Sequence, residues 1–257
     1  MGGFFGAVSA NDCILDVFYG TDYHSHLGTR RGGMTSYSAE LGFQRNIHSI
    51  ENSPFRTKFE KDVEKMRGNI CIGCISDTDP QPIMVRSKLG LYAVCSIGII
   101  QNAKALSEEL LESGCANFET MSSGNINSGG LIGALIAQKS SFVEGIRYAQ
   151  EKIEGTMSLV IMTENSIICA RDKAGKLPIL IGKRADGYCF SFESFAYQKL
   201  GYETCHELKA GEITRLTKDG YDVLYEGTDS MKICTFLWTY YGYPTACYEG
   251  VNVEVMR

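Results

Sequence analysis

The chain has 257 residues, of which 44% are hydrophobic and 21% are charged, a composition typical of folded globular proteins. Its formal net charge of −5 comes from 25 basic and 30 acidic residues, and the densest basic spot, Arg30 with Arg31, is too small for a nucleic-acid-binding patch. No apolar run approaches the ~20 residues of a membrane helix and no secretory signal opens the chain, so we expect a cytoplasmic protein without nucleic-acid or membrane partners.

Strands are the dominant predicted element in both halves of the chain. Nine segments combine alternating hydrophobicity with β-branched and aromatic residues, the pattern of a half-buried strand. They are residues 4–9, 35–41, 69–76, 91–99, 158–163, 166–171, 178–182, 187–192 and 212–216.

Helices are predicted between these strands. The segment SPFRTKFEKDVEKM has an apolar face and Ser53 as its expected N-cap, and NAKALSEELLESG is capped by Asn102 and closed by Gly114. SFVEGIRYAQEKIEG carries a capping box made by Ser141 and Glu144. The preceding SGGLIGALIAQ is apolar on nearly every side, so we expect this helix to be buried between layers.

The order of the elements favours an α+β layered sandwich. Runs of strands broken by pairs of helices, without regular βαβ alternation, argue against a doubly wound parallel sheet. The last segment, residues 232–257, differs from the rest because it is aromatic and holds the only Trp. An apolar segment of this kind needs a surface to cover.

Cysteine and histidine spacing predicts no metal site. The ten cysteines scatter along strand-like runs, where Cys behaves as a small hydrophobe, and the one close pair, Cys71 and Cys74, lies inside such a run. His24 and His26 could share one face of a strand. No third ligand follows at recognisable spacing, so a role in a turn or an interface is the expectation.

Several stretches resemble the amino-terminal glutaminase domain of the amidophosphoribosyltransferase family, which are class II glutamine amidotransferases. They are DVFYGTDYHSHLGTRRGGM, GTMSLVIMTENSIICARDKAGKLPILIGKR, the ESFA at 193–196 and LKAGEITRLTKDG. The resemblance implies the four-layer αββα sandwich of N-terminal nucleophile hydrolases. It also implies a glutamine amidotransferase-like domain at 1–231 and a connector at 232–257.

The same resemblance implies the partners of this chain. The connector would lead towards a phosphoribosyltransferase-like domain that is absent from the sequence, and the full-length protein is expected to be a homo-oligomer. In this family, which serves purine biosynthesis, the initiator Met is removed and the exposed Cys attacks the glutamine carboxamide with its own amine as base. Here Gly2 occupies that position. Removal of Met1 would leave an amine with no thiol to activate.

Other glutamine-handling positions implied by the resemblance have also changed. The arginine that grips the substrate carboxylate falls on Cys74, with Ser76 as a further pocket position on the same strand. The Asn-Gly oxyanion pair reads Ile97-Gly98, and losing one such donor alone slows a reaction about 100- to 1000-fold. These changes occur together, so a single engineered exchange at position 2 does not explain them.

Two further motifs of the family have lost their charges. Its His-Arg-Gly motif matches His26-Leu27-Gly28, which has no arginine. The acidic stretch that binds the substrate ammonium matches residues 127–130, which include Ser128 and no carboxylate. The scaffold is therefore expected to be intact while no catalytic residue remains.

We expect a degenerate glutaminase domain with a structural or regulatory role, whose partner would use free ammonia. The first alternative is a pocket refitted for another small-molecule ligand, made more apolar by Cys74, Cys95, Ile97 and Ile99. A further possibility is that these side chains fill the pocket, which then binds no ligand.

A second alternative is a hydrolase with a different nucleophile. Cys13, Ser25 and Ser96 are candidates by residue type. Cys234 resembles a position that supplies an iron–sulfur ligand in some family members, but one thiolate does not hold a cluster. No cofactor is expected.

Overall fold

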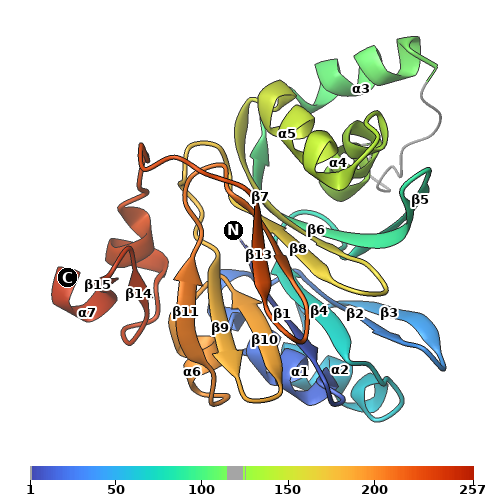
Figure 1. Ribbon diagram of the computed structural model, residues 1–257. Coiled ribbons are helices and arrows are strands. Elements are labelled where there is room, and N and C mark those ends of the chain that lie inside the picture. The colour runs from blue at the N-terminus through green and yellow to red at the C-terminus, as the bar shows by residue number, and fades with distance from the viewer. Residues whose placement is uncertain (1, 115–123, 125) are drawn as a thin grey trace.

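The computed structural model describes residues 2–114, 124 and 126–257. Figure 1 shows two antiparallel sheets stacked face to face, with helices on both outer faces. This is the predicted four-layer αββα sandwich, and the fold class is confirmed. None of the described helices is long and apolar enough to cross a membrane.

The first sheet has seven strands and is covered on its outer face by α1 (Ile14–Asp22) and α2 (Phe55–Val63). Its strand order is β11 (Glu203–Glu207), β9 (Leu180–Arg184), β10 (Gly187–Ser191), β1 (Gly2–Ser9), β4 (Ile70–Ser76), β2 (Arg31–Ser38) and β3 (Gly42–Ser49). The short helix α6 (Ser194–Gln198) follows β10 on the same side.

The second sheet has six strands and carries three helices on its outer face, α3 (Ala103–Glu112), α4 (Ser128–Ala137) and α5 (Phe142–Lys152). Its strand order is β13 (Tyr221–Tyr225), β12 (Ile213–Leu216), β8 (Ile167–Ala170), β7 (Gly155–Met162), β6 (Gly90–Ile100) and β5 (Ile83–Ser87). As predicted, α4 is apolar and largely buried, because it lies between this sheet and the neighbouring helices.

Strand β1 shows how the sequence builds the inner layers. Successive side chains of a strand point to opposite faces, so Phe4 and Val8 enter the core between the two sheets while Phe5 and Ala7 enter the core under α1. A Cβ on Gly6 would lie 2.2 Å from the Phe190 ring. Glycine is therefore required where β1 crosses that ring.

All nine predicted strands are present, although two of them are displaced along the chain, to β2 and β9. In the two large sheets the prediction missed β3, β5, β11 and β13, which are the edge strands. It also missed the short strands β14 (Cys247–Tyr248) and β15 (Val251–Asn252). Edge strands are half exposed and carry polar residues such as those of ETCHE in β11, which weakens the hydrophobic alternation on which the prediction relied.

The helix predictions were partly wrong at the boundaries. The N-cap of α2 is Pro54 and not Ser53, because the helix begins at Phe55. The Ser141 side chain accepts a hydrogen bond from the Glu144 amide, which confirms one half of the capping box. Asn102 stands at the N-cap of α3, but its side chain bonds the backbone after α5 and not its own helix.

Helix α1 was missed altogether. Its buried residues Ile14, Val17, Phe18 and Thr21 follow helical spacing. β-branched and aromatic side chains have low helix propensity, so propensity and periodicity disagreed in this segment. Packing of the apolar face against β1 decided the outcome.

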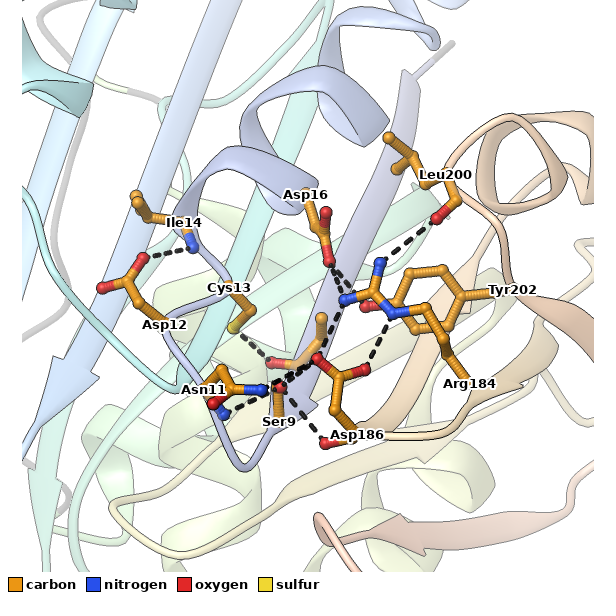
Figure 2. A network of polar contacts seen from close by, with 11 residues as sticks. Ser9, Asn11, Asp12, Cys13, Ile14, Asp16, Arg184, Asp186, Leu200 and Tyr202 are labelled. Carbon is orange, nitrogen blue, oxygen red and sulfur yellow. Dashed lines mark hydrogen bonds and ion pairs between the residues drawn. The ribbon is translucent and has the colours of Figure 1, made fainter.

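A polar network fastens the end of β1 to the hairpin of β9 and β10 (Figure 2). Arg184 donates to Asp186 at 2.7 Å and to Asp16 on α1 at 2.8 Å. The Asp186 carboxylate in turn accepts from Asn11 and Ser9. The network ties α1, β1 and the hairpin together at one end of the sheet.

Residues 232–257 pack beside the first sheet and form a π-helical turn (Leu237–Tyr241), β14 (Cys247–Tyr248), β15 (Val251–Asn252) and α7 (Val253–Met256). Trp238 and Tyr248 are buried in the same core that lies between the sheets. The segment therefore covers a surface of the domain, as its apolar composition requires. The boundary between a domain at 1–231 and a connector at 232–257 stays a prediction.

Two buried ionic groups hold this last segment in place. The Glu193 carboxylate accepts hydrogen bonds from the Tyr248 hydroxyl at 2.7 Å and the Tyr243 amide at 2.9 Å. Arg171, 1% exposed, forms an ion pair with Glu249. Both contacts join the segment to the body of the domain.

Candidate functional site

A cavity of about 280 Å³ opens where the ends of β1, β4 and β6 meet the start of α4. Five of the seven predicted pocket positions line it: Gly2, Ser76, Ile97, Gly98 and Ser128. These five positions come from four separate regions of the chain. The cavity is open, so the side chains at these positions do not fill it.

Gly2 lies at one wall of the cavity, paired with Ser76 of β4. A Cβ on Gly2 would lie 2.5 Å from the Ile75 backbone oxygen. Backbone atoms of a central strand cannot move aside without disturbing the sheet. A side chain at position 2 thus requires a local rearrangement of β1 or β4.

The opposite wall is formed by the end of β6. Ile97 is 6% exposed and belongs to the core between the sheets as well as to the cavity wall. Gly98 has a φ of +141°, and a Cβ there would lie 2.0 Å from the Thr156 oxygen. Glycine is required at 98 because of this backbone shape, whereas Ile97 supplies an apolar surface.

The polar groups at the base of the cavity are mostly occupied by one another. The Gln81 side chain accepts from the Ser96 amide at 2.6 Å and donates to the Ser96 oxygen at 3.1 Å. The Ser76 hydroxyl accepts from the backbone amides of Thr78 at 3.1 Å and Asp79 at 3.2 Å. These bonds fix the loop after β4 and leave these side chains little capacity for a ligand.

Asp79 is the exception. Its side chain is 3% exposed, and it is the acidic residue among the described residues that line the cavity. Its Oδ2 accepts a hydrogen bond from the Ser128 amide at 3.1 Å, in the first turn of α4. This position favours a carboxylate, because a helix N-terminus carries partial positive charge. Sequence reasoning missed Asp79, since it compared only residues 127–130 with the acidic stretch of the family.

Two predicted positions, Cys74 and His26, do not line the cavity. Cys74 is buried between the sheets. Burial, and then the neighbouring Cys74 thiol, raise the pKa of the Cys95 thiol. Side chains alternate along β4, so Ser76, which pairs with Gly2, is the residue of this strand beside the cavity.

His26 lies in the turn after α1, where its Nε2 is 2.8 Å from the Glu193 Oε2. Burial opposes ionisation of Glu193, yet the bond from His26 and the charges of His26 and His24 hold the pKa of this carboxyl below its usual value. His24 donates from Nδ1 to the Gly20 oxygen, while its Nε2 lies beside Ser191. The two histidines therefore face different partners and do not form a metal pair.

The alternative nucleophiles lie in different places. Cys13 is buried under α1 with its thiol donating to the Ala7 oxygen, and Ser25 lies in the turn after α1. Neither lines the cavity as described. Ser96 does, although no histidine lies among the described lining residues to act as its base.

One lining residue comes from the last segment of the chain. Tyr241, at the end of the π-helical turn, closes one side of the cavity. Sequence reasoning did not include it, because the segment was considered only as a connector. Its aromatic content was the signal that could have suggested contact with the domain.

A wider depression of about 870 Å³ lies outside the cavity and shares Asp79 and Ser128 with it. Three cationic residues line this depression: Arg30, Arg31 and Lys104. None of them lines the inner cavity as described. Asp77 and Asp79 line the depression as well, so the approach to the cavity carries charges of both signs.

Comparison with known proteins gives a consistent set of similarities. A family model described as a glutamine amidotransferase domain matches residues 66–198. Among curated proteins, the amidophosphoribosyltransferase of Archaeoglobus fulgidus is 25% identical over 251 residues, covering 94% of this chain and 53% of the relative. That of Methanocaldococcus jannaschii is 26% identical and covers 100% of this chain and 59% of the relative. The chain spans about half the length of the curated relatives it matches.

Solved structures agree on the fold. The glutamine phosphoribosylpyrophosphate amidotransferase of Bacillus subtilis, complexed with ADP and GMP, has a TM-score of 0.86 at 23% identity, covering 98% of this chain and 55% of that chain. A glutamine aminotransferase class-II domain protein from Silicibacter pomeroyi has a TM-score of 0.57 at 10% identity, covering 86% and 97%. At these identities the likeness concerns architecture alone.

Proposed function

The chain belongs to the glutamine amidotransferase domain family, and from that membership we propose that it is a degenerate glutaminase domain of an amidophosphoribosyltransferase-like protein. In this proposal the domain does not hydrolyse glutamine. It serves a structural or regulatory role towards a phosphoribosyltransferase-like domain that lies outside this sequence and would use free ammonia.

The observation that carries the proposal is the composition of the cavity wall. The described lining residues include neither a cysteine nor a cationic side chain, and Asp79 is the charged group among them. The α-carboxylate of glutamine would therefore meet the charge of Asp79 and no cationic side chain among the described lining residues. Burying an uncompensated charge costs several kcal/mol.

The geometry of Gly2 supports the same reading. A nucleophile at position 2 needs a side chain, and a Cβ there would collide with the Ile75 oxygen. The oxyanion position is occupied by Ile97, whose side chain has no donor. Both the attacking group and one stabilising donor are missing together.

Ammonia release from glutamine tests this proposal. We expect the purified chain and its Gly2→Cys variant to release no ammonia above background, with a glutaminase of known activity assayed in parallel. Mass spectrometry of the variant must show removal of Met1, so that a free Cys amine and thiol are present. Substantial glutaminase activity in either protein would overturn the proposal.

A second candidate function is a small-molecule binding module, and one observation favours it: the cavity beside Gly2 remains open at about 280 Å³. A pocket that had merely decayed would be expected to fill with side chains, since packed interiors leave few voids larger than a water molecule. The two functions are compatible, because a regulatory domain can act through a bound ligand.

A further inference from the structure

The cavity contains one buried charge that the proposed function does not use. Asp79 is 3% exposed, and of its two carboxylate oxygens only Oδ2 has a hydrogen-bond partner, the Ser128 amide. Within residues 2–114, 124 and 126–257, no donor bonds Oδ1 and no cationic side chain lies within 4.0 Å of the carboxylate. The carboxylate thus retains an unused acceptor, and Asp79 lines a space that a ligand can enter.

The charges around the cavity favour a positively charged ligand. The cations near the site, Arg30, Arg31 and Lys104, line the outer depression and form no ion pair with Asp79. A buried carboxylate without an ion-pair partner favours a cation brought in from solution. An anionic ligand in the cavity would meet only repulsion from Asp79.

The apolar side chains of the cavity wall favour a hydrocarbon chain in the rest of the ligand. Ile75, Ile97 and Leu177 supply apolar surface, while the Ser76 and Gln81 side chains are engaged with the backbone. Asp79 supplies the one charged contact among the described lining residues, with apolar surface around it, as in many small-ligand sites. The hydroxyls of Ser96, Ser128 and Tyr241 also line the cavity.

We propose that this cavity binds a small aliphatic primary amine in its protonated form, with the ammonium group on Asp79 and the hydrocarbon chain against Ile97 and Leu177. The ligand carries no carboxylate next to the amine, which distinguishes it from an amino acid. The inference rests on the proposed function in one respect, namely that the cavity no longer accommodates glutamine.

A matched set of probes tests the head group. n-Pentylamine, 1-pentanol and pentanoate share one hydrocarbon chain and differ in charge, and L-glutamine adds the zwitterion. We expect pentylamine to raise the unfolding temperature of the whole chain with concentration, because a ligand bound only by the native state stabilises it. Titration calorimetry should show the alcohol and the acid binding at least 10-fold more weakly. Equal binding of amine and alcohol, or no binding of the amine, would overturn the inference.

Two variants locate the binding. Asp79→Asn keeps the shape of the side chain and an acceptor for Ser128 while removing the charge, so pentylamine affinity should fall at least 10-fold. Asp219→Asn makes the same exchange at an exposed position on the surface and should leave the affinity unchanged. Ile97→Phe adds volume inside the cavity and should also weaken binding, which decides the matter if Asp79→Asn is poorly folded. Unchanged affinity in both cavity variants would place the amine elsewhere and overturn the inference.

The outcomes separate the two proposals. Ammonia release from glutamine would overturn the proposed loss of hydrolysis while leaving the amine titration to be judged by itself. An absence of amine binding, together with an absence of ammonia release, would overturn only the ligand inference.

Discussion

The two ends of β1 differ in whether the charged side chains beside them have ion-pair partners. At the Ser9 end, Arg184 is surrounded by acceptors from Asp16, Asp186 and the Leu200 backbone, so that the charges there are paired (Figure 2). At the Gly2 end, the same strand borders an open cavity in which the Asp79 carboxylate has no ion-pair partner among the described residues.

This difference would allow the residues of the cavity to vary while the fold persists. The polar network that joins β1 to α1 and to the β9–β10 hairpin lies at the Ser9 end of β1, away from the cavity. Residues that line the cavity can be exchanged without breaking it. Stabilities of well-separated sites are usually additive, so the scaffold and the cavity can vary independently.

The largest predicted effect is on the pH dependence of the free energy of unfolding. It comes from His24, which packs against the Gly2 end of β1. Burial lowers the pKa of His24 from 6.5 to about 4, although the Glu193 charge opposes the shift. The unfolded chain therefore binds a proton between pH 6.5 and pH 4 that the folded chain does not. Stability is full above pH 6.5 and should fall by about 3 kcal/mol as the pH approaches 4.

Denaturant unfolding at intervals from pH 7 to pH 4 measures how the free energy of unfolding changes with pH. In His24→Asn this change should be smaller. Asp186→Asn is the matched variant from the other end of β1. Hydrogen bonds from Arg184 lower the pKa of Asp186 from 3.8 to about 2, so its stabilisation is present above pH 3.8 and is lost below it. Asp186→Asn should therefore alter the pH dependence only under pH 4. A wild-type stability independent of pH between 6.5 and 4 would contradict the prediction.

The next effect is the loss of the network at the Ser9 end. Arg184→Met removes two ion pairs and the contact of the guanidinium with the Tyr202 ring at 4.4 Å, while keeping an apolar stem. The free energy of unfolding should fall by about 2 kcal/mol, more than an exposed pair contributes, because these groups are mostly buried. Chemical denaturation at pH 7 measures the change.

The control is Arg215→Met, which breaks a single ion pair with Asp222 between two exposed side chains. Its cost should stay below about 1 kcal/mol. If the comparison is right, Arg184→Met also leaves pentylamine affinity unchanged, since the network does not line the cavity. An equal cost for the two arginine variants would show that the network adds nothing beyond surface pairing.

The sequence predicted the central strands and the αββα layers because buried strands carry the strongest hydrophobic pattern. It missed the edge strands β3, β5, β11 and β13, where half-exposed polar residues hide the alternation. Through the resemblance to a known family it named five of the fourteen described residues that line the cavity.

The sequence could not predict which residues from distant parts of the chain lie next to one another in the cavity wall. Asp79 enters the cavity from the loop after β4, held by the bond of Ser76 to its backbone amide, and Tyr241 arrives from the far end of the chain. A motif comparison that proceeds one position at a time cannot show that a carboxylate from another element lies in the same cavity. Cys74 was included in the pocket for the same reason, although it faces the core.

The smallest predicted effect is the most discriminating, because it makes one chemical change at both ends of β1. Asp186→Asn should lower the free energy of unfolding at pH 7 by about 2 kcal/mol, the value of its lowered pKa. Asp79→Asn should change the free energy by less than about 1 kcal/mol in either direction. The amide oxygen can still accept from Ser128, and loss of the favourable helix-end contact is offset by removal of a buried charge.

Denaturant unfolding of the two variants at pH 7, without ligand, provides the comparison. In the presence of pentylamine the order should reverse, because only Asp79→Asn forfeits the stabilisation that the bound amine gives to the native state. A loss of 2 kcal/mol or more for Asp79→Asn without ligand would mean that the carboxylate is already paired in the native protein. The two ends of β1 would then not differ in whether their charged side chains are paired.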